Sequence, residues 1–503
     1  MVAIGMVSHD SANIWFRSHR PGPVTVRWWP KEATEQAAWT TIDIAEDNSA
    51  DNTGLVTIPV DGERFTPMTR YRYALVHADD GKEMGNGGFE TFPATEDDTP
   101  TRFSIAVASC HQPFLPDGTL RPDSSRMLTA VRRCMTERNT KFLLMVGDQM
   151  YADFPEPLSL FNRDYFATLK PYDKETLCDC TTSTVRRLYQ DRYRIFWNQR
   201  EWQRLQCEHP CLPILDDHDI LDNWGSRPVY QNEKWQNVGL GARRAYFDYQ
   251  GKRVQVREFL DDSLPDSFDY HFCYGNTATF VMDLRSNRTA GDNGQLYSPL
   301  QQQAFEDFLQ ASSNKKVLLV VLSVPVIHLP RFIAKMVAKL PHTGEDFSDR
   351  WSTGSHIDDR DRMLKILRVH SLRFPCQKII LLSGDIHIGC VHAISWKAGG
   401  PDIYQLTSSP ITHKTPMLVQ LGSNLLIKAN RNVMTRRKQL EADVRLLGGT
   451  GGYRANPYGG RNIGMIEIHT PSPGAEPTIT FLIYGQKNNE SDEPVCVYQS
   501  PPL

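Results

Sequence analysis

The sequence predicts an all-β region followed by a larger α/β region. Residues 1–97 contain runs rich in β-branched and aromatic residues, and no helical pattern interrupts them. From Phe103 onward, short apolar runs alternate with segments of helical periodicity, as in proteins that cover a largely parallel sheet with helices. We therefore expect an α/β (α+β) fold preceded by an all-β domain.

The N-terminal region is expected to form a β-sandwich. Its strand-like runs recur at intervals typical of immunoglobulin-like or fibronectin-like domains. The run from Phe89 to Pro100 begins as a strand and then becomes polar and proline-bounded, which is typical of a linker. The predicted domains are therefore 1–98 and 99–503. The strand-like runs are Ala12–Arg17, Val24–Trp29, Leu55–Val60 and Tyr71–Val76.

The α/β region contains apolar runs that predict buried strands and two segments, 127–138 and 183–206, that predict helices. Strand-like sequence returns near the end of the chain. Segment 331–365 and the helix-like segment 417–445 are expected to form walls over a pocket. The predicted strands are 105–110, 142–148, 211–215, 277–283, 316–323, 378–385, 462–468 and 478–484.

The composition is that of a globular protein with a sizeable core, since 40% of the 503 residues are hydrophobic and 23% are charged. The net charge of -3 gives no sign of a nucleic-acid partner. No apolar run is long enough to span a membrane. The N-terminus begins directly with strand-like sequence, so we expect a cytoplasmic protein unless a leader has been removed. Nothing indicates an oligomeric state.

Ten cysteines do not require disulfides in a chain of this length. Cys178 and Cys180, with Cys207 and Cys211, are close enough in sequence to form a small zinc site or a disulfide. Their spacings are not those of zinc fingers, and the alternative is a set of free buried thiols.

The stretch from Asp216 to Asn223 carries four aspartates, a histidine and an asparagine directly after a predicted strand. Carboxylates this close repel one another, so a positive charge is expected among them, most simply a metal ion. The alternative for such a stretch alone is a solvated acidic loop.

Three other predicted strands end in residues that bind metals: Ser109-Cys110, Gly147–Tyr151 and Gly384–His387. In open α/β sheets the carboxyl ends of strands gather ligands, so these groups are expected to converge. A thiolate and a phenolate suit oxidised iron or zinc, whereas carboxylates and an amide oxygen suit calcium, magnesium or manganese. The sequence therefore predicts a mixed cluster of two or more metals with one bridging aspartate.

The motifs Gly-Asp-x-x-Tyr, Asp-Asp-His-Asp and Gly-Asp-x-His, in this order, resemble those of the alkaline phosphatase D (PhoD-like) family, a branch of the metallophosphoesterases. Gln149 stands where the family usually has an aromatic residue, and Asp219 replaces a commoner glutamate. The resemblance covers nearly the whole chain. Further matching segments are Leu188–Arg194, Met282–Arg288, Asp349–Trp351, Thr407–Thr412 and Asn462–Gly464.

The resemblance implies a metallophosphoesterase-like β-sheet sandwich flanked by helices. It implies an alkaline phosphatase or phosphodiesterase that hydrolyses a small-molecule phosphate ester with Fe(III) and Ca2+ and a metal-activated hydroxide. Cys110, Asp148 and Tyr151 would hold iron, and Asp148 would bridge to calcium. The remaining implied ligands are Asp217, Asn223, Asp385 and His387.

Phosphate ester hydrolysis also needs a proton for the leaving oxygen and cations for the phosphate. His218 is expected to donate the proton while Asp219 orients its ring; the alternative for His218 is to hold a metal ligand in place. Candidate phosphate clamps, each with a structural role as the alternative, are Arg163, Arg192 and Arg285.

Two other functions compete with this hypothesis. A non-catalytic binding protein with a vestigial metal site would have lost ligands, whereas every motif here is filled. Another type of metal-assisted hydrolase would use the same ligands on a different substrate. Neither the substrate nor the preference for monoesters over diesters is encoded in a recognisable motif.

Overall fold

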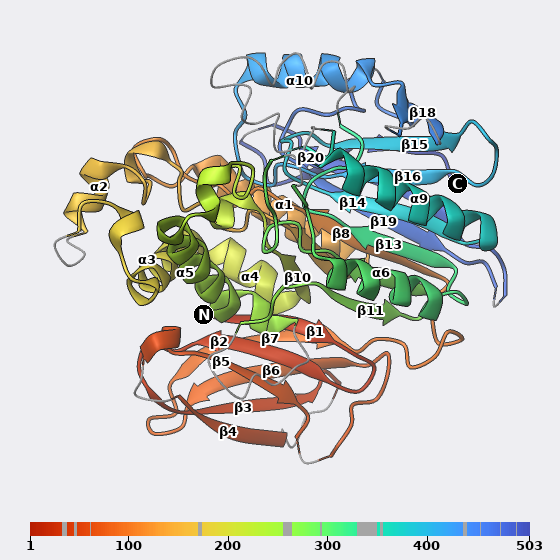
Figure 1. The fold of residues 1–503 in the computed structure, drawn as a ribbon. Helices are drawn as coiled ribbons and strands as arrows, with labels where there is room; N and C mark the ends of the chain where they lie inside the picture. The colour runs from red at the N-terminus through yellow and green to blue at the C-terminus, as the bar shows by residue number, and fades with distance from the viewer. Residues whose placement is uncertain are drawn as a thin grey trace.

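The structure is a computed structural model. It describes the chain except residues 33–37, 45–47, 61, 170–173, 255–263, 292–293, 329–349, 353–355, 436–439, 453, 473 and 489. Figure 1 shows the N-terminal strands as a separate layer of sheets beneath a larger region that mixes strands and helices.

The N-terminal strands form two antiparallel sheets. One has the order β1 (Val2–Val7), β2 (Ala12–Arg17) and β5 (Thr53–Ile58). The other has the order β4 (Ala38–Ile44), β3 (Gly22–Pro30), β6 (Arg70–His77) and β7 (Glu83–Glu90). Alternate residues such as Ile14, Val26 and Leu75 are fully buried in one hydrophobic core. This region is all-β, as the sequence predicts.

A six-stranded sheet forms the first half of the larger region. Its order is β10 (Cys211–Ile214), β9 (Thr140–Val146), β8 (Arg102–Ala108), β19 (Ile463–His469), β20 (Thr478–Gln486) and β21 (Pro494–Gln499). Strands β8, β9 and β10 are parallel, so their carboxyl ends lie at the same edge. Helix α1 (Pro122–Glu137) connects β8 to β9, and α4 (Arg200–Glu208) leads into β10.

An eight-stranded sheet forms the other half. Its order is β11 (Tyr270–Tyr274), β12 (Thr277–Val281), β13 (Val317–Val321), β14 (Lys378–Ser383), β16 (Ile403–Thr407), β15 (Cys390–Trp396), β18 (Glu441–Leu446) and β17 (Asn432–Met434). The four strands from β12 to β16 in this order are parallel. Helices α6 (Pro299–Ala311) and α9 (Ile357–Arg373) lie between them in the chain.

The central strands of the eight-stranded sheet are buried on both faces, which explains their uninterrupted apolar runs. Leu319 and Val321 share a core with the six-stranded sheet, and Tyr404 contacts Phe481 of β20 with ring centroids 5.8 Å apart. The alternate residues Leu318 and Val320 belong to a second core with residues of α6 and α9. The two sheets therefore stack, with helices outside them. The mixed α/β expectation is confirmed.

The other α-helices in the described part of the chain are α2 (Arg163–Thr168), α3 (Thr182–Trp197), α5 (Glu233–Tyr249) and α10 (Met417–Ala429). The predicted helical segment 183–206 is two helices, α3 and α4. The helix-like segment 417–445 is helical only to Ala429, so that prediction is wrong in its second half. Residues of β18 alternate between buried and exposed, a period of two that favours a strand.

Several sequence predictions have no direct test in the fold. Of the predicted wall at 331–365, residues 331–349 and 353–355 lie outside the described residues, and the rest leads into α9. The domain boundary after residue 98 stays a prediction; β7 ends at Glu90 and β8 begins at Arg102.

All ten cysteines are free thiols. Among the helices that the structure describes, none is both long and apolar enough to cross a membrane.

Candidate metal centre

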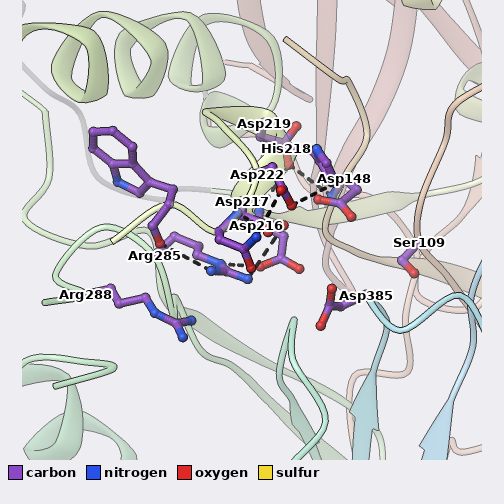
Figure 2. A network of polar contacts seen from close by, with 12 residues as sticks. Ser109, Asp148, Asp216, Asp217, His218, Asp219, Asp222, Arg285, Arg288 and Asp385 are labelled. Carbon is purple, nitrogen blue, oxygen red and sulfur yellow. Dashed lines mark hydrogen bonds and ion pairs between the residues drawn. The ribbon is translucent and has the colours of Figure 1, made fainter. Parts of the chain in front are cut away.

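The four predicted groups converge at one edge of the stacked sheets. Cys110 follows β8, Asp148 follows β9, Asp217 follows β10 and Asp385 follows β14 of the facing sheet. The Cys110 thiol donates to Asp148 Oδ2 at 3.3 Å and lies 3.7 Å from the Asp385 carbonyl oxygen. Figure 2 shows the carboxylate of Asp385 facing those of Asp216 and Asp217. Oxygen atoms of these three carboxylates lie within 4.8 Å of one another, as do ligand atoms of Asp148, Asp217 and His218.

Two glycines permit this convergence. A Cβ on Gly147 would lie 2.4 Å from Asp216 Cβ, and one on Gly384 would lie 2.3 Å from Ser109 Oγ. Gly147 also has a φ of +98°, a conformation that side chains rarely adopt. The glycine before each aspartate in the two Gly-Asp motifs therefore lets neighbouring strand ends approach closely.

Backbone strain is concentrated at this edge. Nine non-glycine residues in the described part of the chain have a positive φ, and five of them are predicted ligands. Such conformations cost on the order of 1–3 kcal/mol each and persist where the surrounding structure imposes them. Their concentration here indicates a functional constraint. The five are Cys110, Asp148, Asn223, Asp385 and His387, with φ of 58°, 57°, 59°, 64° and 54°.

The central carboxylate, Asp148, is buried beside other carboxylates. Burial, followed by the charges of Asp217 and Asp216, raises its pKa well above the ordinary value. Its Oδ1 atom is buried and accepts no hydrogen bond from the described residues. A buried carboxylate oxygen with no donor and with other carboxylates beside it is suited to a metal ion.

The thiol of Cys110 and the phenol of Tyr151 are also buried next to Asp148. Burial raises the pKa of Cys110 and of Tyr151 well above their ordinary values, with Asp148 and Cys110, respectively, as the next cause. The Tyr151 hydroxyl donates to Asp148 Oδ2 at 3.4 Å. Metal binding replaces the protons of such groups, so the donor set of thiol, phenol and carboxylate fits a metal ion.

The eight-stranded sheet contributes His387 and Asp385, which follow β14, to the site. His387 is stacked on His413 with ring centroids 4.1 Å apart, and burial, then His218, lowers its pKa to about 3. It is therefore a neutral imidazole, the form that binds metals. Asp385 forms an ion pair with Arg350.

His218 is held by a carboxylate that the sequence reasoning missed. Its Nδ1 lies 2.8 Å from Asp153 Oδ1, and its ring stacks on Tyr151 at 4.2 Å. Burial opposes the charged imidazolium, but Asp153 and then Asp217 outweigh it and raise the pKa of His218 well above 6.5. Asp153 also accepts a hydrogen bond from the backbone nitrogen of Asp222 at 2.7 Å.

Asp219 does not orient the His218 ring, contrary to the sequence-based expectation. Its Oδ2 accepts hydrogen bonds from the backbone nitrogens of Asp148 and Asp216, both at 3.1 Å. Burial raises its pKa to about 7. Asp219 therefore connects the ends of β9 and β10, while Asp153 takes the contact with His218.

The three predicted phosphate clamps lie in different settings. Arg192 is buried and donates to the carbonyl oxygens of Tyr151 and Phe154 at 2.9 and 2.8 Å. Arg285 is fully buried and donates to Asp216 Oδ1 at 2.5 Å (Figure 2). Arg163 is exposed at the first residue of α2. Arg192 and Arg285 thus bind the loops that carry the site.

Two further site residues lie in segments that matched the family motifs but had no assigned role. Arg350, from the segment 349–351, faces Asp385. Ser409, from the segment 407–412, donates from its hydroxyl to Cys110 Sγ at 3.0 Å and accepts from the His387 backbone nitrogen at 3.1 Å. The position of each in a matching segment was the signal available in the sequence.

Comparison with known proteins identifies the fold and the family. A search of curated proteins finds no match. A solved structure of PhoD is 15% identical and has a TM-score of 0.65, covering 99% of this chain and 91% of that chain, which shows a shared fold. Two other solved structures match with TM-scores too low to carry an argument. One is a calcium binding mutant of Bacteroides uniformis β-glucuronidase 2, with a TM-score of 0.25 and 9% identity, covering 100% of this chain and 60% of that chain. The other is a Paenibacillus sp. cycloisomaltooligosaccharide glucanotransferase, with a TM-score of 0.19 and 12% identity, covering 79% of this chain and 56% of that chain. The family model for PhoD-like phosphatase matches residues 105–446. The chain belongs to the PhoD-like phosphatase family and is a phosphatase-type hydrolase.

Proposed function

We propose that this chain is a metal-dependent hydrolase of phosphate esters that acts on monoesters, diesters or both. One observation carries the proposal: a buried carboxylate, Asp148, has an oxygen with no hydrogen-bond donor among the described residues and lies beside a thiol, a phenol and other carboxylates. A site of this composition has little use except to hold cations.

The proposed assignment follows the chemistry of the donors. Cys110 and Tyr151 would hold iron(III), and Asp148 would bridge to calcium. The other calcium ligands would be Asp217, Asn223, Asp385 and His387. Metals bound here would neutralise phosphate oxygens and lower the pKa of a bound water towards neutral.

His218 is proposed as the general acid for the leaving oxygen. Asp153 holds Nδ1, so the proton donor would be Nε2, which lies 3.7 Å from Asp222 Oδ1. Burial lowers the pKa of His218, but Asp153 and then Asp217 outweigh it, and the raised pKa favours the protonated ring that a general acid requires. Asp153 is a positioning residue, because it acts on substrate only through His218.

Among the described arginines weighed as clamps, Arg350 is the best placed for the phosphate. Its side chain is 13% exposed and faces Asp385. Arg285 is completely buried against Asp216. The proposed clamp is therefore Arg350, with Arg192 and Arg285 as positioning residues.

The domain assignment is also a proposal. We propose residues 1–98 as an immunoglobulin- or fibronectin-like sandwich and 99–503 as a metallophosphoesterase-like domain. The stacking of the six- and eight-stranded sheets supports the second assignment, and the paired three- and four-stranded sheets support the first.

A substrate screen tests the proposed function. Purified protein is assayed on nitrophenyl phosphate, bis-nitrophenyl phosphate and alkyl esters, before and after treatment with a chelator. We expect hydrolysis that is lost on chelation and restored by added metals. Absence of hydrolysis in metal-replete protein would favour the non-catalytic binding function, and undiminished activity after complete metal removal would exclude the metal mechanism.

A further inference from the structure

A second cleft lies where the N-terminal sheets meet the larger region. It has a volume of about 770 Å³, within the range of ligand-binding sites. One wall comes from β6 and β7, and the other comes from α1, α4 and the start of β9. None of the residues of the metal centre lines it.

The cleft is strongly basic although the whole chain is slightly acidic. Six cationic side chains line it, against the two carboxylates of Glu90 and Glu208. Four of the six are arginines, whose planar groups bind phosphate oxygens in pairs. The six are Lys31, Arg70, Arg72, Arg132, Lys141 and Arg204.

Ion pairs within the cleft use only part of this positive charge. Glu90 pairs with Arg70 at 3.0 Å and with Lys141 at 2.5 Å. Arg132 pairs with Glu208 at 2.8 Å and with Glu201 at 2.7 Å, and Arg204 also pairs with Glu201, at 3.6 Å.

Two exposed cations remain in the cleft. Lys31 and Arg72 form no ion pair with the residues that the structure describes. The excess positive charge therefore favours an anion that carries several charges over a single carboxylate.

The walls of the cleft are fixed to each other. A Cβ on Gly87 of β7 would lie 2.0 Å from the carbonyl oxygen of Cys207 at the end of α4, so only glycine permits this approach. The Tyr73 hydroxyl donates to the same carbonyl oxygen at 3.2 Å. The cationic groups are thus held on a preformed frame, which lowers the entropy cost of binding.

The cleft and the metal centre lie at opposite ends of the same strand. Lys141 stands near the start of β9, and Asp148 follows its end. At about 3.3 Å per residue, the two sites are roughly 20 Å apart. A small ligand in the cleft cannot also reach the metal centre.

We propose that this cleft is a second anion site, which binds a small phosphate-type anion with several charges, such as an inorganic oligophosphate. Its role is to bind an effector or a product-like anion away from the metals. The site involves no residue of the catalytic machinery.

Calorimetric titration of the full-length, metal-containing protein with inorganic triphosphate tests this proposal. The cleft variant carries Lys31→Glu and Arg72→Glu. The matched control carries Arg64→Glu and Lys82→Glu, two exposed cations of the N-terminal region outside the cleft, so that net charge changes equally. Binding at the metal centre and chelation of metal are common to all three proteins, and differences between them therefore report the cleft.

We expect the cleft variant to bind triphosphate at this site about tenfold more weakly or worse, because each charge-assisted contact is worth roughly one such factor. The control and the hydrolysis of nitrophenyl phosphate should not change. Unchanged triphosphate binding in the cleft variant, or an equal loss in the control, would overturn the proposal. If the charge reversals reduce the melting temperature, the milder pair Lys31→Gln and Arg72→Gln replaces them with the same criteria.

Discussion

Two buried aspartates with nearly the same backbone conformation illustrate the difference between a structural and a functional carboxylate. Asp51 and Asp148 have φ of 55° and 57° and are 4% and 1% exposed. Burial would raise the pKa of Asp51, but hydrogen bonds from Arg17, Tyr249 and Arg194 outweigh it and lower the pKa. Asp148 has carboxylates for neighbours, and its pKa is raised.

The difference lies in what each site supplies. The Arg17 guanidinium, from β2, contacts both oxygens of Asp51 at 2.7 and 2.9 Å, and Arg194, from α3, lies 2.7 Å away. Asp51 thus joins the N-terminal sheets to the larger region with its charge compensated by the protein. At Asp148 the protein supplies backbone strain and several negative charges, which is the environment expected of the proposed metal site.

Asp148→Asn should give the largest effect and separates the two roles. We expect activity to fall by at least about 10⁴-fold, because metal contributions of several kcal/mol are lost together. The melting temperature of the metal-free variant should equal or exceed that of metal-free wild type, since repulsion with Asp216 and Asp217 is relieved. A variant that keeps its metals and activity would contradict the assignment.

His218→Asn tests the proton donor. We expect alkyl ester hydrolysis to slow by about 10²–10⁴-fold and nitrophenyl ester hydrolysis much less, since a phenolate leaves without protonation. Asp153→Asn should show the same selectivity with a smaller loss, about 10–100-fold. The measurements are kcat/KM on both esters and metal content. Equal losses on both esters, with metal lost, would mean that His218 holds the site together and is not the acid.

Arg350→Ala should raise KM for phosphate esters by roughly 10–100-fold, the worth of one or two charge-assisted hydrogen bonds. Arg163→Ala is the matched control, because Arg163 is an exposed arginine on α2. Steady-state measurement of KM for both variants shows which of the two arginines binds the phosphate. If Arg163→Ala raises KM and Arg350→Ala does not, the original sequence-based choice is correct.

Asp51→Asn should reduce stability while leaving kcat unchanged. Removal of one partner from a buried ion pair costs about 3 kcal/mol, which a urea unfolding curve detects. Retained stability would mean that Arg17 and Arg194 find other partners.

Wild type and Asp51→Asn also test how the Asp51 carboxylate makes the stability depend on pH. A folded-state pKa below the unfolded value of 3.8 gives stability that is present above pH 3.8 and is lost as the pH falls through the folded-state pKa. Wild type should therefore lose more stability than Asp51→Asn over this acid range. Parallel losses would exclude Asp51 as a source of the acid sensitivity.

Much of the fold was predictable because buried parallel strands produce continuous apolar runs, as in β9 and β14. The predicted helix is wrong after Ala429, where the chain forms β17 and β18. A pattern of only six residues does not distinguish a strand from the continuation of a preceding helix.

The convergence of the candidate ligands at one edge was predictable, because the carboxyl ends of parallel strands bring their following residues together. The partners of those ligands were not, because they depend on tertiary contacts that carry no local pattern. Asp153, for example, contacts His218 from 65 residues away. Asp219 appeared next to His218 in sequence, yet its side chain turns toward the backbone of Asp148 and Asp216.

The most direct test of the central claim is metal analysis of active protein together with its visible absorption spectrum, for wild type and Tyr151→Phe. A phenolate or thiolate on iron(III) absorbs visible light, so we expect iron and calcium in wild type and an absorption band that Tyr151→Phe weakens or shifts. Active wild-type protein that contains no bound metal and shows no visible absorption would contradict the account.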